Sequence, residues 1–417
     1  MTEKIAIIGG GIAGLTAGYL LHERYDVTLF EGDNRLGGNA YTLDTRSDEE
    51  IDISVFFYSR LEYPNFCKLL KKLGIESATW PMEGLSQSFQ NLTTKRTHYL
   101  SCDTTRPASI LSAKNFKSLF QQGIVIWNYS KGARLSKAGQ FKDRTLRQAL
   151  TFLPGLKDDV AKLAILPVCL MTSMYWNELM DAPAEFVFAK IEKQFGSLRK
   201  FSSWRLLPCK TREYIDKLAD PFRDKIRLNS PVRAVSRADK SVTVKLDDGE
   251  ELQFEKVIFA CPADRALALI EDATAEETRL LGAWRYNEGL VVVHTDSSAY
   301  PPEHLWAMYS YLYSDEGGEI DTSINAHYRF QNGVPDNSRY IGTQYPNISF
   351  RKESIEFQKV FRTPVYDGKS TASIEALPSL NGTLNSFFCG SHFGYGLHED
   401  AVTSAVNVGK MLGANWE

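Results

Sequence analysis

The stretch KIAIIGGGIAGLTAGYLLHERYDVTLFEGDNRLGG, residues 4–38, constrains the fold more than any other part of the chain. Its apolar run Ile5–Ile8 predicts a buried parallel strand. Gly9–Gly14 follows at once with the spacing G-x-G-x-x-G, and Leu15–Leu21 predicts a helix. A second apolar strand is predicted at Val27–Phe30. This order of strand, glycine turn, helix and strand is typical of a Rossmann-like unit that binds a dinucleotide.

Each position of the glycine turn has a physical task. Gly9 permits the tight turn, Gly11 lets the backbone approach a pyrophosphate, and Gly14 lets the helix pack close on the strand. Ile12 and Ala13 are expected to present free N–H groups to the phosphates at the positive end of the helix. An ordinary tight turn that binds nothing is the alternative, and the strand and helix around the motif favour the dinucleotide.

The residues after the second strand indicate which dinucleotide is bound. Glu31 stands at the end of that strand, where a carboxylate can accept hydrogen bonds from both ribose hydroxyls, and Gly32 follows it. The next segment consists of Arg35, Leu36, Gly37, Gly38 and Asn39. An acid, a short spacer and R-x-G-G resemble the FAD-binding half of the amine oxidase and phytoene desaturase superfamily. The resemblance implies FAD, which we expect to be held without a covalent bond, and Asn39 stands where that family often has a further arginine.

Composition and charge exclude several classes of protein. The chain has 417 residues, of which 43% are hydrophobic and 24% charged, and it is long enough for two or three domains. A formal net charge of −3 gives no indication of a nucleic-acid surface. No uninterrupted apolar run approaches the roughly 18 residues of a spanning helix, and the early first strand leaves no room for a signal peptide. We expect a cytoplasmic protein of undetermined oligomeric state with no nucleic-acid partner.

The cysteines and histidines give no indication of a metal or a disulfide framework. The six cysteines are scattered without a C-x-x-C pair, so free thiols in a reducing compartment are expected. The seven histidines form no cluster with ligand spacing, and no metal site is predicted.

The order of predicted elements favours interleaved domains, because no linker or internal repeat separates consecutive ones. We expect an FAD-binding domain composed of residues 1–60, 221–283 and 375–417. The substrate domain is expected to combine residues 61–220, which are mostly helical in pattern, with residues 284–374, which add a mixed sheet. By the resemblance, the fold class is α/β: a Rossmann-like FAD-binding domain of glutathione-reductase type, in its amine oxidase variant, with an interleaved α+β substrate domain.

A change of hydrophobic period marks a second approach to the cofactor. Residues 232–254 alternate apolar and polar side chains in three runs separated by turns, which predicts a three-stranded meander. Lys256–Ala260 is then a buried strand that ends just before Pro262. By the resemblance, Val232 offers backbone groups to the adenine, and Ala260 and Pro262 are further contacts of the cofactor. A surface sheet that touches nothing is the alternative.

The C-terminal segment is the second place where chemistry is visible. A strand is predicted at Ser386–Cys389 and a helix from about Ala401 to Leu412, with GSHFGYGLHED between them. The glycines let the backbone pass beside a flat ligand, and the positive end of the helix can stabilise negative charge on a reduced flavin. The cofactor contacts predicted in this segment are Gly390, Ser391, Gly396, Leu397 and His398.

Three residues of the same segment are candidate catalytic residues. His392 and His398 could move a proton near the flavin, because imidazole titrates near neutral pH. Tyr395 could stack on the flavin. Histidines that bond backbone carbonyls and a tyrosine that only packs are the alternatives.

The resemblance narrows to one bacterial and plant family of NAD/FAD-binding, amine-oxidase-like oxidoreductases. The matching runs are SVFFY at Ser54–Tyr58, YPNF at Tyr63–Phe66 and FFCGSHFGYGLHEDAVTSA at residues 387–405. Two departures stand out. Cys209-Lys210 replaces a paired glycine, and Leu290 stands where amine oxidases proper place a lysine that holds a water against flavin N5. Oxidation of a simple amine is therefore not the first expectation.

Three functions stay open. Association of the family with enzymes that modify unsaturated acyl chains, together with the aromatic-rich middle of the chain, favours a hydrophobic, lipid-like or acyl-chain-like substrate. Hydride transfer between it and flavin N5 would desaturate it or shift a double bond. The second function is a flavin amine oxidase that releases hydrogen peroxide. The third is a non-enzymatic FAD-binding protein, which gains little support because no surface amphipathic helix is evident; a transient contact with a membrane surface stays open.

Overall fold

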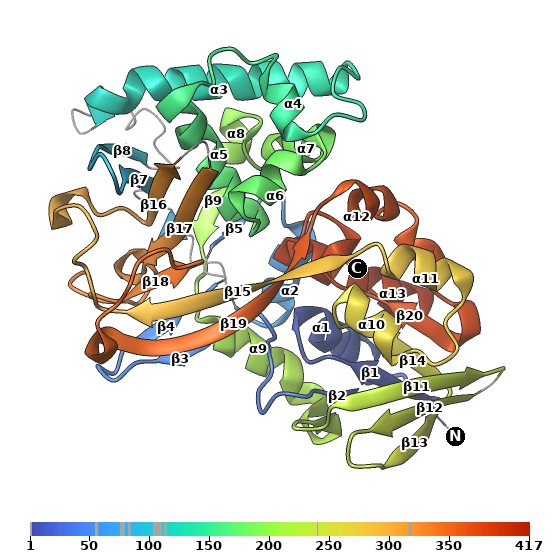
Figure 1. Cartoon of the computed structure of the whole chain (residues 1–417). Helices are drawn as coiled ribbons and strands as arrows, with labels where there is room; N and C mark the ends of the chain where they lie inside the picture. The colour runs from blue at the N-terminus through green and yellow to red at the C-terminus, as the bar shows by residue number, and fades with distance from the viewer. Residues whose placement is uncertain are drawn as a thin grey trace.

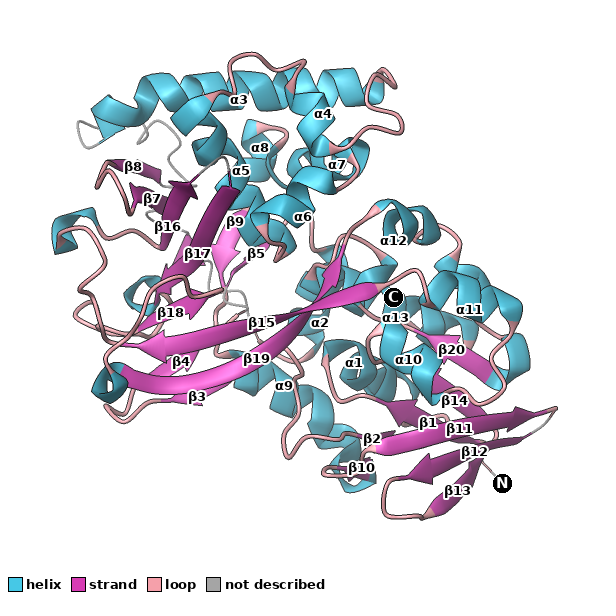
Figure 2. Ribbon diagram, viewed as in Figure 1, coloured by secondary structure: helices cyan, strands magenta, loops and turns pink. Residues whose placement is uncertain are grey.

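The computed structural model describes residues 2–54, 57–75, 80–81, 85–102, 111, 115–239, 241–316 and 319–417. Val55 and Phe56, part of one run that carries the family resemblance, lie outside the described residues. Figure 1 shows a parallel sheet with its helices and a small meander on one side of the molecule, and a larger sheet with most of the other helices on the opposite side. The long strands β15 (Arg285–His294) and β19 (Ile355–Val365) run between the two parts (Figure 2).

A five-stranded parallel sheet forms the first part, in the order β10-β2-β1-β14-β20. Its strands are β10 (Ile226–Arg227), β2 (Asp26–Phe30), β1 (Lys4–Ile8), β14 (Lys256–Phe259) and β20 (Ser386–Phe388). β1 lies in the middle, and Ile5, Ala6 and Ile7 are fully buried, as expected for a parallel strand covered on both faces. The strands come from all three segments predicted for the FAD-binding domain, whose boundaries stay predictions.

Helices α1 (Ile12–Leu21) and α13 (His398–Met411) pack against each other beside this sheet. Both predicted helices are confirmed, and each begins about three residues earlier than its apolar pattern indicates. Glycine permits the close approach, because a Cβ at Gly409 would lie 3.0 Å from the side chain of Leu20. The N-terminal ends of α1 and α13 lie at the edge of the sheet that also carries the glycine-rich loops.

The predicted meander is present as β11 (Val232–Ala238), β12 (Ser241–Leu246) and β13 (Glu251–Phe254), paired antiparallel. A buried ion pair anchors it to the rest of the domain. The guanidinium of Arg237 contacts Glu277 of α11 (Ala275–Leu281) and donates to Ser386 Oγ at 3.1 Å, at the start of β20. Both charged side chains are almost completely buried, so the pair is well shielded from solvent.

The second part contains a seven-stranded sheet in the order β19-β15-β18-β17-β16-β7-β8. Its remaining strands are β18 (Ile341–Gln344), β17 (Glu319–His327), β16 (Tyr309–Glu316), β7 (Leu85–Asn91) and β8 (Thr97–Cys102). β7 pairs parallel with β16, while the other neighbours are antiparallel. Tyr311 stacks on Phe89 on the face toward the main core, with ring centroids 4.9 Å apart.

The expectation that residues 61–220 are mostly helical holds, and strands β7 and β8 lie among the helices. Their pattern is hidden because the buried face of β7 carries hydroxyl groups instead of apolar side chains. Ser88 Oγ lies 2.7 Å from Ser310 Oγ, and Ser86 Oγ accepts the N–H of Met308 at 2.8 Å. One short sheet falls partly in this segment, with β5 (Phe57–Ser59), β9 (Trp204–Leu206) and β6 (Trp80–Pro81). Another, β3 (Thr42–Asp44) with β4 (Glu50–Asp52), precedes it.

Helices still make up most of this segment. They are α2 (Pro64–Lys72), α3 (Phe116–Lys137), α4 (Leu146–Leu150), α5 (Asp158–Thr172), α6 (Trp176–Asp181), α7 (Ala184–Phe195), α8 (Leu198–Phe201) and α9 (Thr211–Ala219). Ala164, Leu166 and Val168 of α5 are completely buried, so this apolar stretch is core. Across the described residues, we find no helix with both the length and the apolarity to cross a bilayer.

Candidate cofactor site

Three turns meet at the carboxyl edge of the parallel sheet. Gly9, Ala260 and Cys389 follow β1, β14 and β20, and each donates its N–H to a carbonyl of the neighbouring strand at 2.9, 2.9 and 3.0 Å. Gly390 directly follows Cys389, and Pro262 lies two residues after Ala260. The carboxyl edge of an open parallel sheet is where such folds bind ligands. The structure therefore brings the predicted contacts of three distant segments to one edge.

The first glycine turn leaves room where a phosphate needs it. Gly9 has φ +112°, and a Cβ there would lie 2.8 Å from the carbonyl oxygen of Ala260. A Cβ at Gly14 would lie 1.9 Å from the carbonyl oxygen of Gly9. At Gly11, by contrast, a Cβ would meet no atom within 4 Å. That open space lies at the start of α1, beside the first backbone N–H groups of the helix, which is the arrangement a pyrophosphate requires.

The second glycine loop lies directly against the first. Gly37 donates its N–H to the carbonyl of Gly10 at 2.8 Å, and Gly37 forms an isolated bridge with Gly11. A Cβ at Gly38, which has φ +58°, would lie 3.3 Å from the Cα of Gly11. The glycines of R-x-G-G thus permit the close approach of two loops that the sequence predicts.

Arg35 holds the second loop in shape. Its Nη1 donates to the carbonyls of Leu36 and Ala40 at 2.9 and 3.1 Å, and its guanidinium lies 4.0 Å from the ring centroid of Tyr41. Burial lowers the pKa of Arg35. Its Nε is buried and has no hydrogen-bond partner among the described residues, so this N–H is available to a phosphate oxygen.

Glu31 lies beside the first turn, as predicted. One carboxylate oxygen accepts the N–H of Gly10 at 2.7 Å and the other accepts that of Asp33 at 2.9 Å. Each oxygen keeps lone pairs for ribose hydroxyls. A Cβ at Gly32 would lie 3.5 Å from Pro231, which precedes Val232, so this turn lies against the start of the meander; the contact of Val232 with adenine stays a prediction.

Contacts to β15 and β19 join this edge to the larger sheet. Asn39, which replaces the family arginine, donates from Nδ2 to the carbonyl of Arg362 at 3.0 Å. The guanidinium of Arg362 pairs with Asp264 at 2.6 Å. Ala263, the first residue of α10 (Ala263–Leu269), donates its N–H to Tyr286 Oη at 2.9 Å. Asn39 therefore fastens the second loop to β19.

The C-terminal loop is held by its own side chains. Gly390 donates its N–H to Ser404 Oγ at 2.9 Å, and Ser391 begins a single 3₁₀ turn. The carboxylate of Asp400 accepts the N–H groups of Tyr395 and Leu397 at 2.9 and 2.8 Å. These two N–H groups lie just before α13, so the loop is fixed directly ahead of the helix.

The two candidate catalytic histidines are packed among aromatic rings. His392 is buried with its ring 5.6 Å from that of Trp284. His398 Nε2 lies 3.0 Å from Tyr214 Oη, and its ring is edge-on to Phe66 at 4.9 Å. Burial lowers the pKa of each histidine to about 4, so both imidazoles are neutral at pH 7. Their catalytic roles stay predictions.

Tyr395 lies in a stack of three rings that crosses between the two parts of the molecule. Its ring centroid is 5.2 Å from that of Phe186 on α7, and Phe186 lies 4.5 Å from Tyr366. The Tyr366 hydroxyl is buried without a hydrogen-bond partner among the described residues, and it faces Gly396, where a Cβ would lie 2.3 Å away. A role for Tyr395 against the flavin itself stays a prediction.

Lys190 of α7 is a residue that the sequence did not single out. Its side chain is buried, and Nζ donates to the carbonyl of Tyr395 at 2.6 Å. Burial lowers the pKa of Lys190 to about 7. In the sequence, Lys190 stands among the apolar residues of the run EFVFAKI, and this was the one indication that it could be buried. A lysine in such a run is usually assumed to point to solvent.

A polar group lies where β15 and β19 reach α6 and the end of α5. Asn287 and Thr363 are cross-strand neighbours, so their side chains share one face of the sheet. Asn287 Nδ2 donates to Glu178 at 2.6 Å, while Thr363 Oγ1 and Tyr345 Oη donate to the carbonyl of Ser173 at 3.2 and 2.6 Å. We call Glu178, Asn287, Tyr345 and Thr363 the hairpin cluster. β15 contains no lysine, and Leu290 is partly buried.

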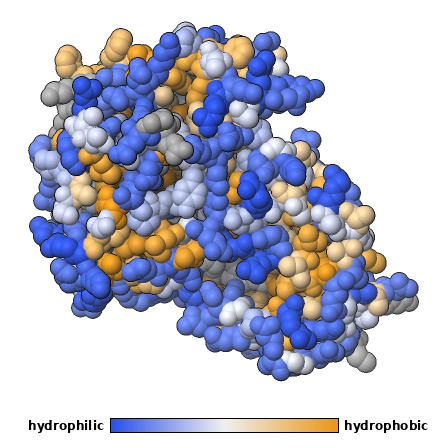
Figure 3. Space-filling model, in the orientation of Figure 1, coloured by the Kyte–Doolittle hydropathy of each residue, from blue (hydrophilic) through white to orange (hydrophobic). Residues whose placement is uncertain are grey.

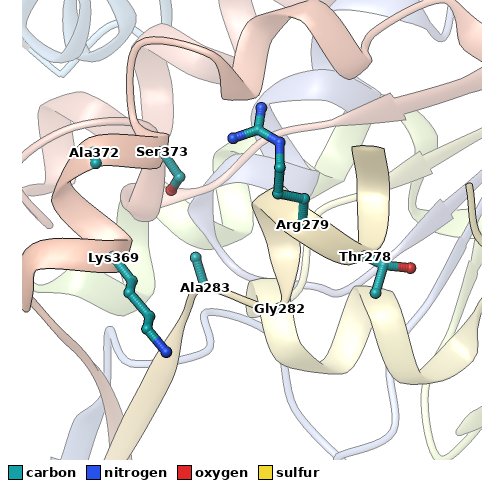
Figure 4. A pocket seen from close by; sticks show the side chains of 7 residues that line it. All are labelled: Thr278, Arg279, Gly282, Ala283, Lys369, Ala372 and Ser373. Atoms are coloured by element: carbon teal, nitrogen blue, oxygen red, sulfur yellow. The ribbon is translucent and has the colours of Figure 1, made fainter. Parts of the chain in front are cut away.

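A separate hollow of about 390 Å³ lies between α11 and α12 (Gly368–Ser373). Figure 4 shows its lining side chains, which include Arg279 and Lys369. It contains none of the predicted cofactor contacts, although Ser373 Oγ at its wall accepts the indole N–H of Trp284 at 3.0 Å. The hollow is therefore not part of the cofactor edge.

The cysteines and the potential metal ligands are dispersed in the structure. All six cysteines are free, as expected. Within the described ranges, no group of three or more histidine, cysteine or acidic side chains is arranged to hold a metal ion.

Comparison with known proteins identifies the family. The model of the flavin containing amine oxidoreductase family matches residues 12–297. Bovine amine oxidase [flavin-containing] B is 22% identical over 267 residues, which are 62% of this chain and 50% of the relative. The chain thus spans about half the length of the curated relatives it matches.

Solved structures share the fold over the whole chain. The CLA-producing fatty acid isomerase from P. acnes has a TM-score of 0.68 at 15% identity and covers 99% of both chains. Cyclohexylamine oxidase from Brevibacterium oxydans IH-35A has a TM-score of 0.70 at 14% identity, covering 99% of this chain and 100% of the other. The glycine turns, Glu31 and the free Nε of Arg35 fit an extended dinucleotide. This chain belongs to the flavin containing amine oxidoreductase family, and its cofactor is FAD.

Proposed function

We propose that this protein is an FAD-dependent oxidoreductase that acts on a hydrophobic, acyl-chain-like substrate. The observation that carries the proposal is the composition of β15, which has no lysine and places Leu290 where amine oxidases proper place one. Leu290 lies opposite Val360 on β19, and the amide of Asn287 and the hydroxyl of Thr363 form a cross-strand pair three residues further along these strands. Neither can take over the charge of an ammonium group.

The surroundings of the C-terminal loop support an apolar substrate. Phe186 and Tyr366 are buried in one ring stack, and Leu397 ends the loop with an aliphatic side chain. Such walls exclude water and favour a hydrocarbon chain. The fatty acid isomerase among the structural neighbours carries a name consistent with this substrate class, although its likeness extends to the fold alone.

Desaturation of a carbon chain removes a hydride from one carbon and a proton from the next, so both need an acceptor. When bound, FAD supplies a two-electron acceptor for a hydride from a substrate carbon, and its return to another carbon would shift a double bond without net oxidation. Desaturation also releases a proton from the neighbouring carbon. His392 and His398 are neutral at pH 7, because burial lowers the pKa of each to about 4, so each is unprotonated but only a weak base for that proton.

The test mixes the FAD-loaded protein anaerobically with oleate or linoleate. We expect the visible flavin band to bleach, or the fatty acid to be recovered as a positional or geometric isomer. Saturated fatty acids of equal length have no double bond to shift, so bleaching by them would indicate desaturation, whereas an isomer of oleate or linoleate without bleaching would indicate isomerisation. A flavin that is reduced by dithionite alone, with every fatty acid recovered unchanged, would overturn the proposal and favour a non-enzymatic FAD protein.

Amine oxidation is the second candidate, and the hairpin cluster is the observation that favours it. The carboxylate of Glu178 lies near two tyrosine rings, Tyr175 and Tyr345, whose centroids are 4.1 Å apart. A carboxylate with aromatic faces can receive a protonated amine. Release of hydrogen peroxide on a panel of alkyl amines, with a KM that rises in Glu178→Gln, would establish this function in place of the first.

A further inference from the structure

The first half of helix α3 exposes large apolar side chains to solvent. Phe116, Phe120 and Trp127 point to solvent, with 79%, 79% and 55% of their surface exposed. Their spacing of four and seven residues places them on one face of the helix. The face toward the protein instead buries polar side chains, including Ser118 and Asn128. Folding alone does not explain this pattern, because burial of apolar surface would favour the opposite arrangement.

The inward face is small and polar because α3 packs very close to its neighbours. A Cβ at Gly132 would lie 2.1 Å from the ring of Phe188 on α7. Asn128 Nδ2 donates to the carbonyl of Ile124 at 2.8 Å and faces Gly155, where a Cβ would approach to 2.5 Å. The large side chains therefore have no room inside. The exposed rings of α3 escape an amphipathic pattern in the sequence, because its polar and apolar residues lie on both sides of the helix.

Positive charge accompanies the exposed rings. The sequence of α3 contains Lys117, Lys131, Arg134 and Lys137 and no acidic residue, although the whole chain has a net charge of −3. Lys131 Nζ lies 5.4 Å from the ring centroid of Trp127 and donates to the carbonyl of Phe152 at 2.8 Å.

An exposed aromatic ring with a cation beside it also lies beyond α3. Phe152 is itself exposed at the surface, and the guanidinium of Arg144 lies 5.1 Å from its ring centroid. Figure 3 shows apolar side chains along the upper edge of the molecule, where Figure 1 draws α3. Rings and cations thus alternate over one continuous region.

We propose that this region, the α3 face formed by Phe116, Phe120, Ile126, Trp127 and Phe152, docks on an anionic lipid bilayer. Aromatic side chains favour the boundary between headgroups and acyl chains, and lysine and arginine beside them attract anionic headgroups. A second copy of the chain fits less well, because α3 carries no carboxylate to neutralise the cations of a partner helix. Docking requires no particular reaction at the flavin and goes beyond the function proposed above.

The experiment measures co-sedimentation of the FAD-loaded protein with vesicles of phosphatidylcholine that contain about one-third phosphatidylglycerol. We expect binding to fall about tenfold or more in the triple variant Phe116→Ser, Phe120→Ser and Trp127→Ser. Vesicles of phosphatidylcholine alone, or added salt, should also weaken binding of the wild type. Val360→Ser with Met411→Ser is the matched control, because these exposed apolar residues lie outside the α3 face and should leave binding unchanged.

Two further readouts separate docking from misfolding and self-association. The triple variant should keep its flavin content and thermal midpoint, and lipids carrying bromine should quench wild-type tryptophan emission more than that of Trp127→Phe. Equal binding of wild type and triple variant would overturn the proposal. So would sedimentation velocity that shows a wild-type dimer, a monomeric variant and no vesicle binding, since a second copy would then be the occupant. Either failure leaves the fatty acid assays unaffected, because those assays contain no vesicles.

Discussion

At the scale of single residues, Lys190 shows how surroundings set the charge of a side chain. Its ammonium group is enclosed between the carbonyl of Tyr395 and the ring of Tyr366, whose centroid lies 5.5 Å from Nζ. Asp400 raises the pKa of Lys190, but burial outweighs that attraction and lowers the pKa to about 7. Near neutral pH, Lys190 is therefore present partly as the amine and partly as the ammonium ion. It lies directly against the loop that precedes α13.

This pKa predicts a pH-dependent stability. The folded protein releases the proton of Lys190 near pH 7, whereas the unfolded chain keeps it up to the ordinary value of 10.5. Between these values the unfolded state binds more protons, so the free energy of unfolding rises with pH, by up to about 1.4 kcal/mol per pH unit. Lys190→Met should remove this slope between pH 7 and 9 in denaturant titrations. Lys193→Met, a partly exposed neighbour, is the control; parallel curves for wild type and Lys190→Met would contradict the assignment.

Substitution of two glycines in the first turn should impair two different properties, FAD binding in one variant and stability of the fold in the other. Gly11→Ala adds a methyl group to open space, so the apoprotein should lose no more than about 1 kcal/mol of stability, the cost of alanine at the start of a helix. The same methyl group occupies the room for a phosphate, and FAD affinity should fall about tenfold or more. Gly14→Ala instead collides with the Gly9 carbonyl and should destabilise the fold itself. Flavin content and the thermal midpoint of the apoprotein separate the two outcomes.

These residues also show what the sequence can and cannot predict at this scale. The glycine turn, Glu31 and Arg35 could be located because their roles depend on spacing within a short stretch of chain. Lys190 could not, since its partner Tyr395 is 205 residues away and the burial that changes its charge depends on packing between distant segments. The free Nε of Arg35 likewise becomes visible once the loop is folded.

At the scale of elements, α2 depends on a side chain from the other end of the chain. Its N-cap residue Tyr63 offers no side-chain hydrogen bond. The buried carboxylate of Glu399 on α13 accepts the N–H groups of Asn65 and Phe66 at 3.0 and 2.8 Å, and Thr403 Oγ1 donates to it at 3.0 Å. Negative charge at this end also complements the helix dipole. Glu399, which lies in the first turn of α13, therefore also caps a second helix.

Removal of this cap should be costly. Glu399→Ala leaves two N–H groups of α2 without a partner, and we expect a loss of about 2–4 kcal/mol in the free energy of unfolding. Glu23→Ala, on an exposed residue, should change stability by no more than about 0.5 kcal/mol. Thermal and denaturant midpoints of the three proteins make the comparison. A Glu399→Ala protein as stable as Glu23→Ala would show that water replaces the cap.

Elements were predictable where the buried face is apolar. β1, β2, β14, β20 and the meander follow that rule and were located to within a few residues, whereas the short strand β10 was not predicted. β7 was missed because serine hydroxyls fill its buried face and bond one another. Strand β17 ends at His327, and Tyr328–Phe330 form a 3₁₀ turn. The hydroxyl of Tyr328 occupies the space beside Gly342, where a Cβ would lie 1.9 Å away, so the chain turns to insert this ring.

At the scale of the whole molecule, the cofactor edge is assembled from segments that are far apart in the chain. Residues 9–14, 35–39, 260–262 and 390–398 meet there, and β15 and β19 join them to the larger sheet through Arg362 and Tyr286. The interleaved order could be inferred because each segment carries its own glycine or strand signal. The exact domain boundaries depend on contacts that no local pattern reports, and they stay predictions.

This assembly predicts that FAD stabilises the protein as a whole. A ligand that binds the folded state alone adds about 4 kcal/mol when its concentration is a thousand times its Kd. Flavin-free protein should therefore unfold at a lower temperature, and added FAD should raise the midpoint in a concentration-dependent way. FMN, which lacks the adenosine half that Glu31 is expected to hold, should raise it less, and Gly11→Ala should respond weakly to either. Equal midpoints with and without FAD would mean that the four segments form the edge without a cofactor, and the role assigned to their glycines would then have to be abandoned.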